Sequence, residues 1–107
     1  MARTLINAPS TAKRGEVIEV RATIGHPMET GFRPGDSGEL LPRNIIQRFS
    51  CRYNGVEVFS AELFSAMAAN PYIAFFVRAQ DSGTLVLRWD GDNGFTQSES
   101  VALTVTG

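Results

Sequence analysis

The sequence predicts an all-β domain, an immunoglobulin-like β-sandwich of about seven antiparallel strands. Short segments alternate apolar and polar side chains with a period of two, the pattern of a half-buried strand. Glycine, proline and Asn-Gly pairs separate these segments at the positions where turns are needed. The chain has 107 residues, enough for one hydrophobic core, so we expect a single domain over residues 1–107.

The first half of the chain contains four predicted strands. A short strand is expected over residues 2–7 and a longer one over residues 16–24, where every second side chain from position 18 is apolar. Residues 44–53 alternate in the same way. Asn54-Gly55 is the strongest two-residue hairpin signal, so the strand that follows over residues 56–59 should pair with the one before it.

The second half adds three more strands and one segment of different character. Residues 61–69 could form a helical turn that ends before Asn-Pro. Strands are predicted over residues 72–79, 84–90 and 95–105, with the leucines and the tryptophan of the middle one directed inward. The cluster Asp90–Gly94 predicts the turn between the last two strands.

Two segments depart from simple alternation. Residues 25–42 form a long connection with four Gly and three Pro, and a loop of this length in a small domain is usually functional or mobile. Residues 72–77 are apolar on both strand faces, which places Tyr72 and Phe76 on the outer face. An exposed aromatic pair on a strand indicates a surface that something covers.

Composition excludes several classes of function. The net charge of −1 argues against a nucleic-acid partner, and no apolar run is long enough for a membrane span. One Cys and one His leave no internal disulfide and argue against a structural zinc site. The charge is unevenly distributed: residues 1–53 carry 8 basic and 5 acidic side chains, and residues 54–107 carry 2 and 6.

Few side chains could carry chemistry. His26 would have to serve any Ser-His-Asp hydrolase, but the Gly-x-Ser-x-Gly turn is absent, so we expect it to bond its own loop or a partner. Strand parity makes Cys51 a core thiol, with a disulfide to another chain as the alternative. Asp90–Gly94 resembles the start of a calcium loop but has Gly94 and Phe95 at the fifth and sixth positions, which favours a plain turn. Trp89 is expected in the core rather than on a ligand platform.

The segment His26–Gly31, His-Pro-Met-Glu-Thr-Gly, resembles the signature loop of the SoxZ family of the bacterial sulfur-oxidising system. The similarity continues in family order from about residue 14 to residue 105. The other positions that carry it are Arg33, Gly38, Pro42, Ile45, Asn54-Gly55, Asn70-Pro71-Tyr72, Leu87 and Trp89.

The resemblance implies an immunoglobulin-like fold and a role in thiosulfate oxidation. In this family SoxZ is a non-catalytic subunit without a cofactor. It pairs with SoxY, in a heterodimer or a higher complex, and SoxY carries the covalent sulfur intermediates on a C-terminal cysteine arm. Transient contact with the other Sox enzymes is a further expectation. Independently of the resemblance, the exposed apolar face indicates a homodimer of the isolated chain when SoxY is absent. The resemblance also implies a periplasmic location by export together with SoxY, since no signal peptide is visible.

Partner-binding candidates fall in two groups. Four lie in the long loop, and four are aromatic residues on or near the strand over 72–77. A stand-alone immunoglobulin-like module that binds protein or carbohydrate is the alternative function, and a small enzyme using His26 or Cys51 is a third hypothesis. The partner-binding candidates are His26, Met28, Glu29, Arg33, Phe59, Phe64, Tyr72 and Phe76.

Overall fold

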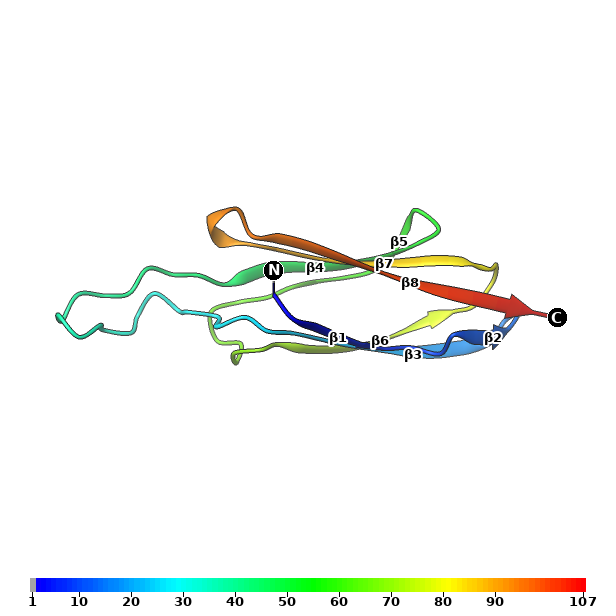
Figure 1. Ribbon diagram of the computed structural model, residues 1–107, viewed down its shortest axis with the longest axis horizontal. Helices are drawn as coiled ribbons and strands as arrows, with labels where there is room; N and C mark the ends of the chain where they lie inside the picture. The colour runs from blue at the N-terminus through cyan, green and yellow to red at the C-terminus, as the bar shows by residue number, and fades with distance from the viewer. Residues whose placement is uncertain (1) are drawn as a thin grey trace.

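The computed structural model describes residues 2–107, and it is built from strands and one short 3-10 turn. The strands lie in two layers, and the N-terminal strands contribute to both (Figure 1). The elements are β1 (Thr4–Asn7), β2 (Thr11–Lys13), β3 (Val17–Ile24), β4 (Ile46–Tyr53), β5 (Val56–Glu62), β6 (Tyr72–Arg78), β7 (Gly83–Gly91), η1 (Asp92–Gly94) and β8 (Thr96–Thr106).

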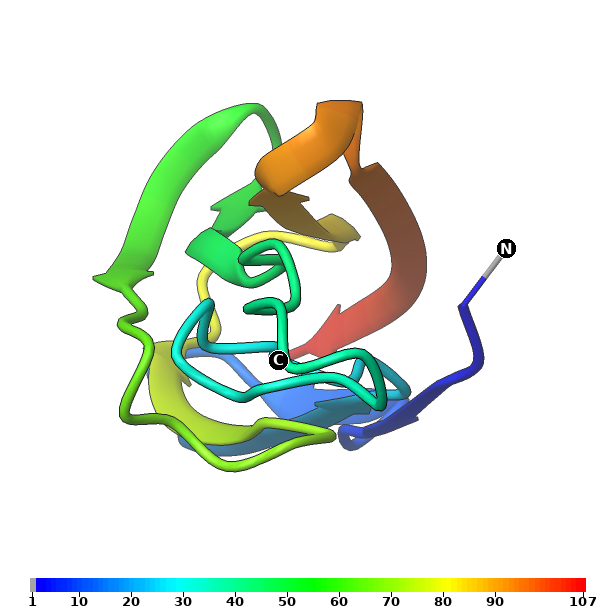
Figure 2. The ribbon, with the colours of Figure 1, turned by 90° about the vertical axis from the view of Figure 1, so that its left-hand side faces the viewer.

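The two layers form the predicted sandwich. One sheet has the order β1-β3-β6 and the other the order β2-β8-β7-β4-β5. Seen from one end, the edge strands β5 and β6 lie on the same side of the sandwich (Figure 2). The prediction of an all-β, immunoglobulin-like sandwich is confirmed. The described residues form eight strands rather than about seven, because β2 adds a three-residue strand that pairs in parallel with the end of β8.

The core lies between the sheets and follows the alternation of the sequence. Every second residue of β3 from Ile18 to Ile24 is buried, as are Leu85, Leu87 and Trp89 of β7. Aromatic rings join the layers: Phe49 of β4 lies 5.7 Å from Phe75 of β6 and 5.2 Å from Trp89, measured between ring centroids. These tilted contacts are geometries that aromatic rings favour.

The hairpin between β4 and β5 forms where Asn54-Gly55 predicts it. Both residues have positive φ, 49° and 84°, as a type I′ turn requires. The helical turn considered over residues 61–69 does not form. β5 continues to Glu62 because Ala61 pairs with Phe49 of β4, and the residues that follow make a tight turn in which Met67 N–H bonds to Phe64 C=O.

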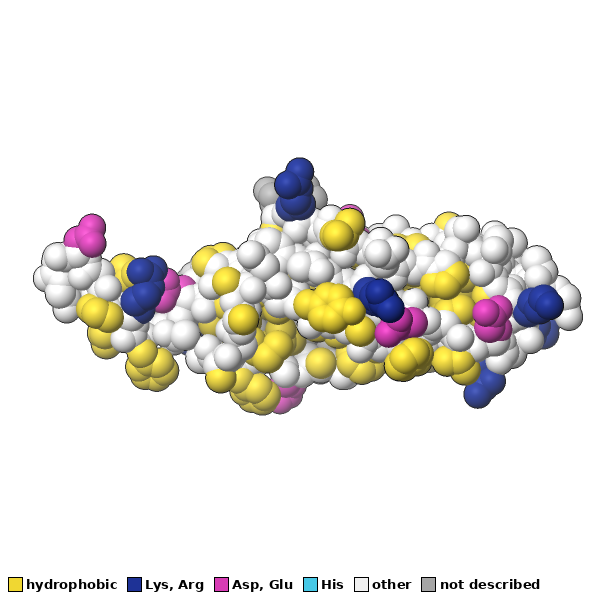
Figure 3. Space-filling model, turned by 90° about the horizontal axis from the view of Figure 1, so that it is seen from below, with side chains coloured by type: hydrophobic (Ala, Val, Ile, Leu, Met, Phe, Trp, Pro, Cys, Tyr) yellow, Lys and Arg dark blue, Asp and Glu magenta, His cyan; other side chains and the backbone are white. Residues whose placement is uncertain are grey.

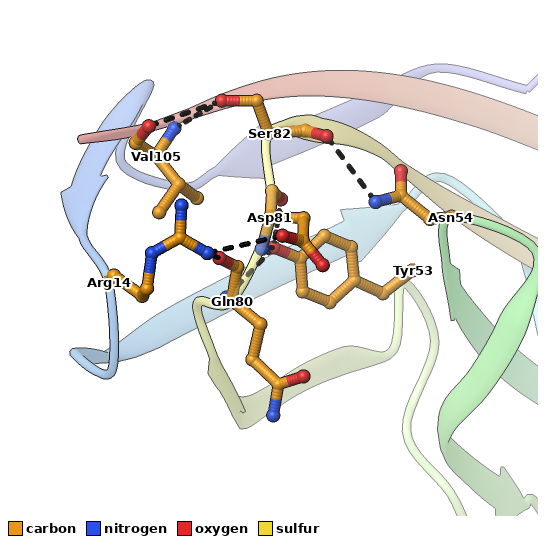
Figure 4. A network of polar contacts seen from close by, with 7 residues as sticks. All are labelled: Arg14, Tyr53, Asn54, Gln80, Asp81, Ser82 and Val105. Carbon is orange, nitrogen blue, oxygen red and sulfur yellow. Dashed lines mark hydrogen bonds and ion pairs between the residues drawn. The ribbon is translucent and has the colours of Figure 1, made fainter. Parts of the chain in front are cut away.

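A polar network fixes the β6–β7 turn at one end of the sandwich (Figure 4). The Tyr53 hydroxyl accepts hydrogen bonds from the backbone N–H groups of Gln80 and Asp81, at 3.1 and 3.0 Å, and donates to the Asp81 carbonyl. Arg14 forms an ion pair with Asp81 at 3.2 Å, and Ser82 Oγ accepts from Val105 N–H at 2.7 Å. This network ties β4, the β6–β7 turn and β8 together.

The molecule is elongated, with principal extents of 61 × 20 × 20 Å. Its radius of gyration is 16.3 Å. A compact chain of this length would have about 13 Å. The excess comes from residues 25–45, called the arm here, which project beyond the sheets at the end opposite the β6–β7 turn (Figure 1). Within residues 2–107 there is no helix of the length and apolarity needed to cross a membrane.

Candidate functional site: a projecting arm and an exposed aromatic sheet face

The predicted loop is an ordered, two-stranded arm. Near its base, Glu29 and Asn44 exchange backbone hydrogen bonds of 2.8 Å in both directions. Further out, Leu41 N–H bonds to Arg33 C=O at 2.8 Å, and a second isolated bridge joins Pro34 and Leu40. Because backbone bonds tie its two sides at both levels, the arm has a defined shape rather than that of an open loop.

Asp92 of η1 anchors the arm to the sandwich. Its carboxylate accepts two hydrogen bonds of 2.9 Å from the Arg43 guanidinium, one of 3.1 Å from Ile45 N–H, and one from the Gln47 amide. The hydrogen bond from Arg43 is the main cause that holds the pKa of Asp92 below its ordinary value, and the Ile45 N–H adds to it. Asp92 thus stays ionised and holds the returning side of the arm against the β7–β8 turn.

His26 and Met28 form the buried floor of the arm. His26 is 5% exposed, and its Nδ1 accepts a hydrogen bond from Met28 N–H at 3.0 Å. Its backbone N–H donates to Asn70 Oδ1, and its ring meets Phe95 edge-on at 5.1 Å. Met28 is 3% exposed and has φ 51°, with its sulfur 3.2 Å from Ile46 N–H. His26 therefore bonds its own loop, one of the two roles expected for it.

Burial lowers the pKa of His26 from its ordinary value, while the nearby charge of Asp92 opposes this shift. The ring is therefore held neutral near pH 7, with Nδ1 as an acceptor and the remaining proton on Nε2. In this state it supports the Met28 turn rather than presenting a charge to solvent.

The other two arm candidates form a surface ion pair. Arg33 binds the Glu29 carboxylate through Nε and through its terminal nitrogen, the latter at 2.6 Å. This hydrogen bond is the first cause of the lowered pKa of Glu29. Arg33 is exposed and Glu29 is half-buried, so the pair is accessible to a partner while it also braces the arm.

The outer face of the three-stranded sheet exposes several apolar side chains, and we call it the aromatic face. Tyr72 and Phe76 of β6 are 57% and 65% exposed, as the strand pattern predicts. Leu5 of β1 and Tyr72 both pair with Thr23 of β3, so the two residues flank Thr23 on the same face of the sheet. Figure 3 shows this face from below, with hydrophobic groups running from the arm toward the far end and charged side chains between them.

The remaining two aromatic candidates differ in their surroundings. Phe64 is 63% exposed in the turn after β5. Phe59 is half-buried and stacks on Phe75 with ring centroids 4.6 Å apart and planes 9° apart. Phe59 thus closes the side of the sandwich between β5 and β6, and it supports the aromatic face from beneath. Partner contact by all eight candidates stays a prediction.

The arm also exposes apolar residues that the sequence analysis did not single out. Phe32 is the most exposed large hydrophobic residue of the described chain, at 78%, and Leu40 near the tip is also exposed. Gly and Pro residues interrupt the sequence around Phe32 and Leu40, so there is no alternation of apolar and polar residues from which their exposure could be predicted. The anchoring role of Asp92 could not be predicted from the sequence either, because its hydrogen-bond partners lie 45–49 residues earlier in the chain.

The side chains that were considered for chemistry or ligand binding have structural roles. Cys51 is buried, as predicted, and burial raises the pKa of its thiol to about 11. Trp89 is buried in the core, as predicted. Within the part of the chain that the structure describes, no three His, Cys, Asp or Glu side chains are placed to hold a metal ion.

The basic first half and the acidic second half of the sequence meet in the fold. Arg14 pairs with Asp81, Arg43 with Asp92, and Arg48 with Glu57. Each of these pairs joins a basic residue of the first half to an acidic residue of the second. The charge asymmetry of the sequence is therefore partly neutralised within the molecule.

Comparison with solved structures shows the same fold in proteins of low sequence identity. The superoxide reductase (neelaredoxin) from Ignicoccus hospitalis matches with a TM-score of 0.73 and 16% identity, covering 98% of this chain and 82% of that one. The sulfur carrier protein SoxY from Chlorobium limicola f. thiosulfatophilum matches with a TM-score of 0.67 and 17% identity, covering 97% and 79%. At such identities the likeness concerns the fold alone.

Sequence comparison is more specific. No curated protein sequence matches this chain. Residues 6–102, nearly the whole sandwich and the complete arm, match the family described as sulphur oxidation protein SoxZ. The chain therefore belongs to the SoxZ family and has a role in sulfur oxidation.

Proposed function

We propose that this chain is the non-catalytic subunit of a SoxYZ-type carrier in thiosulfate oxidation. The observation that carries the proposal is the family match over residues 6–102. The chain would bind SoxY, hold it while SoxY carries the covalent sulfur intermediates, and help the other Sox enzymes to dock. A periplasmic location, reached together with SoxY, forms part of the same proposal.

The chemistry of the chain supports a scaffolding role. A carrier thiol must be accessible and able to ionise, because the thiolate is the nucleophile. Cys51 is buried at the centre of β4, and a thiol with a pKa of about 11 is almost entirely protonated near neutral pH. His26, the other candidate for nucleophilic chemistry, is buried and engaged with Met28.

The surface supports binding to a protein partner. The aromatic face presents Tyr72 and Phe76, and aromatic side chains of this kind are enriched among the residues that dominate protein interfaces. Phe32 and Leu40 extend the exposed apolar area along the arm. We assign the SoxY contact to the aromatic face and assign the arm to contact with SoxY or with the enzymes.

The test is co-purification and titration with the SoxY protein of the same organism. Tyr72→Asp and Phe76→Asp are each expected to weaken binding at least tenfold, which corresponds to about 1.4 kcal/mol. Thr104→Asp, on the outer face of the other sheet, is the matched control and should bind as the unmodified chain does. A chain that shows no affinity for SoxY would overturn the proposal.

A further inference from the structure

Strand β6 has an unusually unprotected edge. The order β1-β3-β6 leaves one side of β6 without a neighbour along seven residues, and its pairing with β3 runs without a register shift. Proteins usually shorten, bend or charge such edges. Three other edge strands in residues 2–107 follow that rule: β1 and β2 have four and three residues, and β5 has a register irregularity and two glutamates. β8 pairs with β2 only over Thr104–Thr106, but Ala2 and Thr4 hydrogen-bond to the side chains of its Gln97 and Glu99. β6 has no charged residue before Arg78.

The backbone hydrogen bonds at both ends of β6 establish which residues direct their N–H and C=O groups to the open edge. Ile24 N–H bonds to Pro71 C=O, and Ala79 N–H bonds to Glu16 C=O. Because hydrogen-bonded pairs alternate along an antiparallel ladder, the backbone groups of Ile73, Phe75 and Val77 point to β3. The residues between them direct their N–H and C=O groups outward; they are Tyr72, Ala74, Phe76 and Arg78.

We propose that this edge pairs with β6 of a second copy of the chain, antiparallel about a twofold axis at Phe75. This interaction goes beyond the proposed function. It would place Ala74 opposite Phe76 of the second copy and Tyr72 opposite Arg78, and the residues with outward backbone groups would then bond one another. The two three-stranded sheets would become one continuous sheet of six strands.

The side chains favour this register. The smallest outward side chain, Ala74, faces the large ring of Phe76, and the charged Arg78 faces Tyr72 rather than another cation. Like charges directly opposite each other destabilise a strand pair, and here there are none. In the proposed register the pair on the axis is Phe75 with Phe75, whose side chains lie on the inner, core-facing side of the sheet. A shift by two residues in either direction instead sets Ala74 opposite Ala74 or Phe76 opposite Phe76 on the outer face, which leaves a gap there or brings two exposed rings together. The outer-face side chains therefore complement one another best in the proposed register, and the contact has the symmetry of a twofold interface.

The mass of the purified chain, followed by light scattering over a range of concentrations, tests the proposal. As the protein concentration increases, the measured mass of the unmodified protein should rise from that of one chain toward that of two. Ala74→Pro removes an outward N–H that has no partner among residues 2–107, so it should hold the mass at that of one chain. Ser60→Pro is the matched control on the β5 edge, where the N–H also points outward because Leu63 N–H bonds to Gln47 C=O.

Two charge variants test the register itself and do not depend on tolerance of proline. The double variant Ala74→Lys, Phe76→Lys places lysines opposite each other twice and should weaken the dimer about tenfold or more. The double variant Ala74→Glu, Phe76→Lys creates two opposite-charge pairs in the proposed register and should retain the dimer.

Several results would overturn the proposal. These are a chain that is monomeric at every concentration, equal effects of Ala74→Pro and Ser60→Pro, or equal effects of the two charge variants. A monomeric chain in which Ala74→Pro abolishes binding to SoxY would assign the edge to SoxY instead. Binding of SoxY by a chain that never dimerises would leave the proposed function intact, so the two failures are distinguishable.

Discussion

Replacing Asp92 with alanine is expected to lower the free energy of unfolding by about 2 kcal/mol. The largest part comes from the Ile45 N–H, which lies in a partly buried position and would lose its acceptor. An unsatisfied buried donor costs about 1–3 kcal/mol. The ion pair with Arg43 is half exposed on the arginine side and adds at most about 1 kcal/mol. For a domain of this size, the loss corresponds to a fall in melting temperature of about 8 °C or more.

The single tryptophan makes the measurement direct. Trp89 is buried in the core, so its fluorescence reports unfolding in denaturant. Asp90→Ala is the matched control, because Asp90 pairs with Arg88 on the exposed sheet surface, where such pairs contribute about 0–1 kcal/mol. If Asp92→Ala and Asp90→Ala destabilise the protein equally, Asp92 does not anchor the arm.

The pH dependence of the Asp92 effect has a definite sign. Since the folded protein lowers the pKa of Asp92, chiefly through Arg43, the carboxylate stabilises the fold above its ordinary pKa near 4. This stabilisation decreases as the pH falls below that value and disappears below the lowered pKa. The stability difference between the unmodified protein and Asp92→Ala should therefore be constant near neutral pH and shrink in acid.

Three further predictions concern other buried groups. Tyr53→Phe should lower the free energy of unfolding by about 1–2 kcal/mol, because the N–H groups of Gln80 and Asp81 lose their acceptor; denaturant titration checks this. Burial lowers the pKa of His26 in the folded chain, so protons favour the unfolded chain once the pH is below the ordinary pKa of about 6.5, and stability should fall as the pH drops below that value. His26→Gln should remove this slope in unfolding titrations. Cys51, with its raised pKa, should react with a thiol reagent slowly when folded and rapidly in denaturant; rapid reaction of the folded chain would contradict its burial.

The strands could be predicted because their periodicity is local. Leu85, Leu87 and Trp89 alternate with polar residues, and that pattern alone is enough to direct them into the core. The three residues of β2 are too few to show a period, and their pairing with the end of β8 depends on the fold of the whole chain. The candidate helical turn over 61–69 did not form because pairing of Ala61 with Phe49 outweighed local helix propensity.

The candidate site could be predicted only in part, because some of its residues depend on contacts with residues that are distant in the sequence. Exposure of Tyr72 and Phe76 follows from strand parity, so the sequence was sufficient. Burial of His26 depends on Asn70 and Phe95, which lie 44 and 69 positions later in the chain, and a loop residue is expected at the surface by default. The order of the arm likewise depends on Asp92, whose sequence context indicates only a turn.

The central claim is that this chain supports a sulfur carrier without carrying sulfur itself. Its most direct test is mass spectrometry of the complex with SoxY after reaction with thiosulfate and the other Sox enzymes. We predict a complex of the two chains under native conditions and, after denaturation, the sulfur adduct on SoxY with this chain at its unmodified mass. A sulfur adduct on Cys51, lost in Cys51→Ala, would contradict the account.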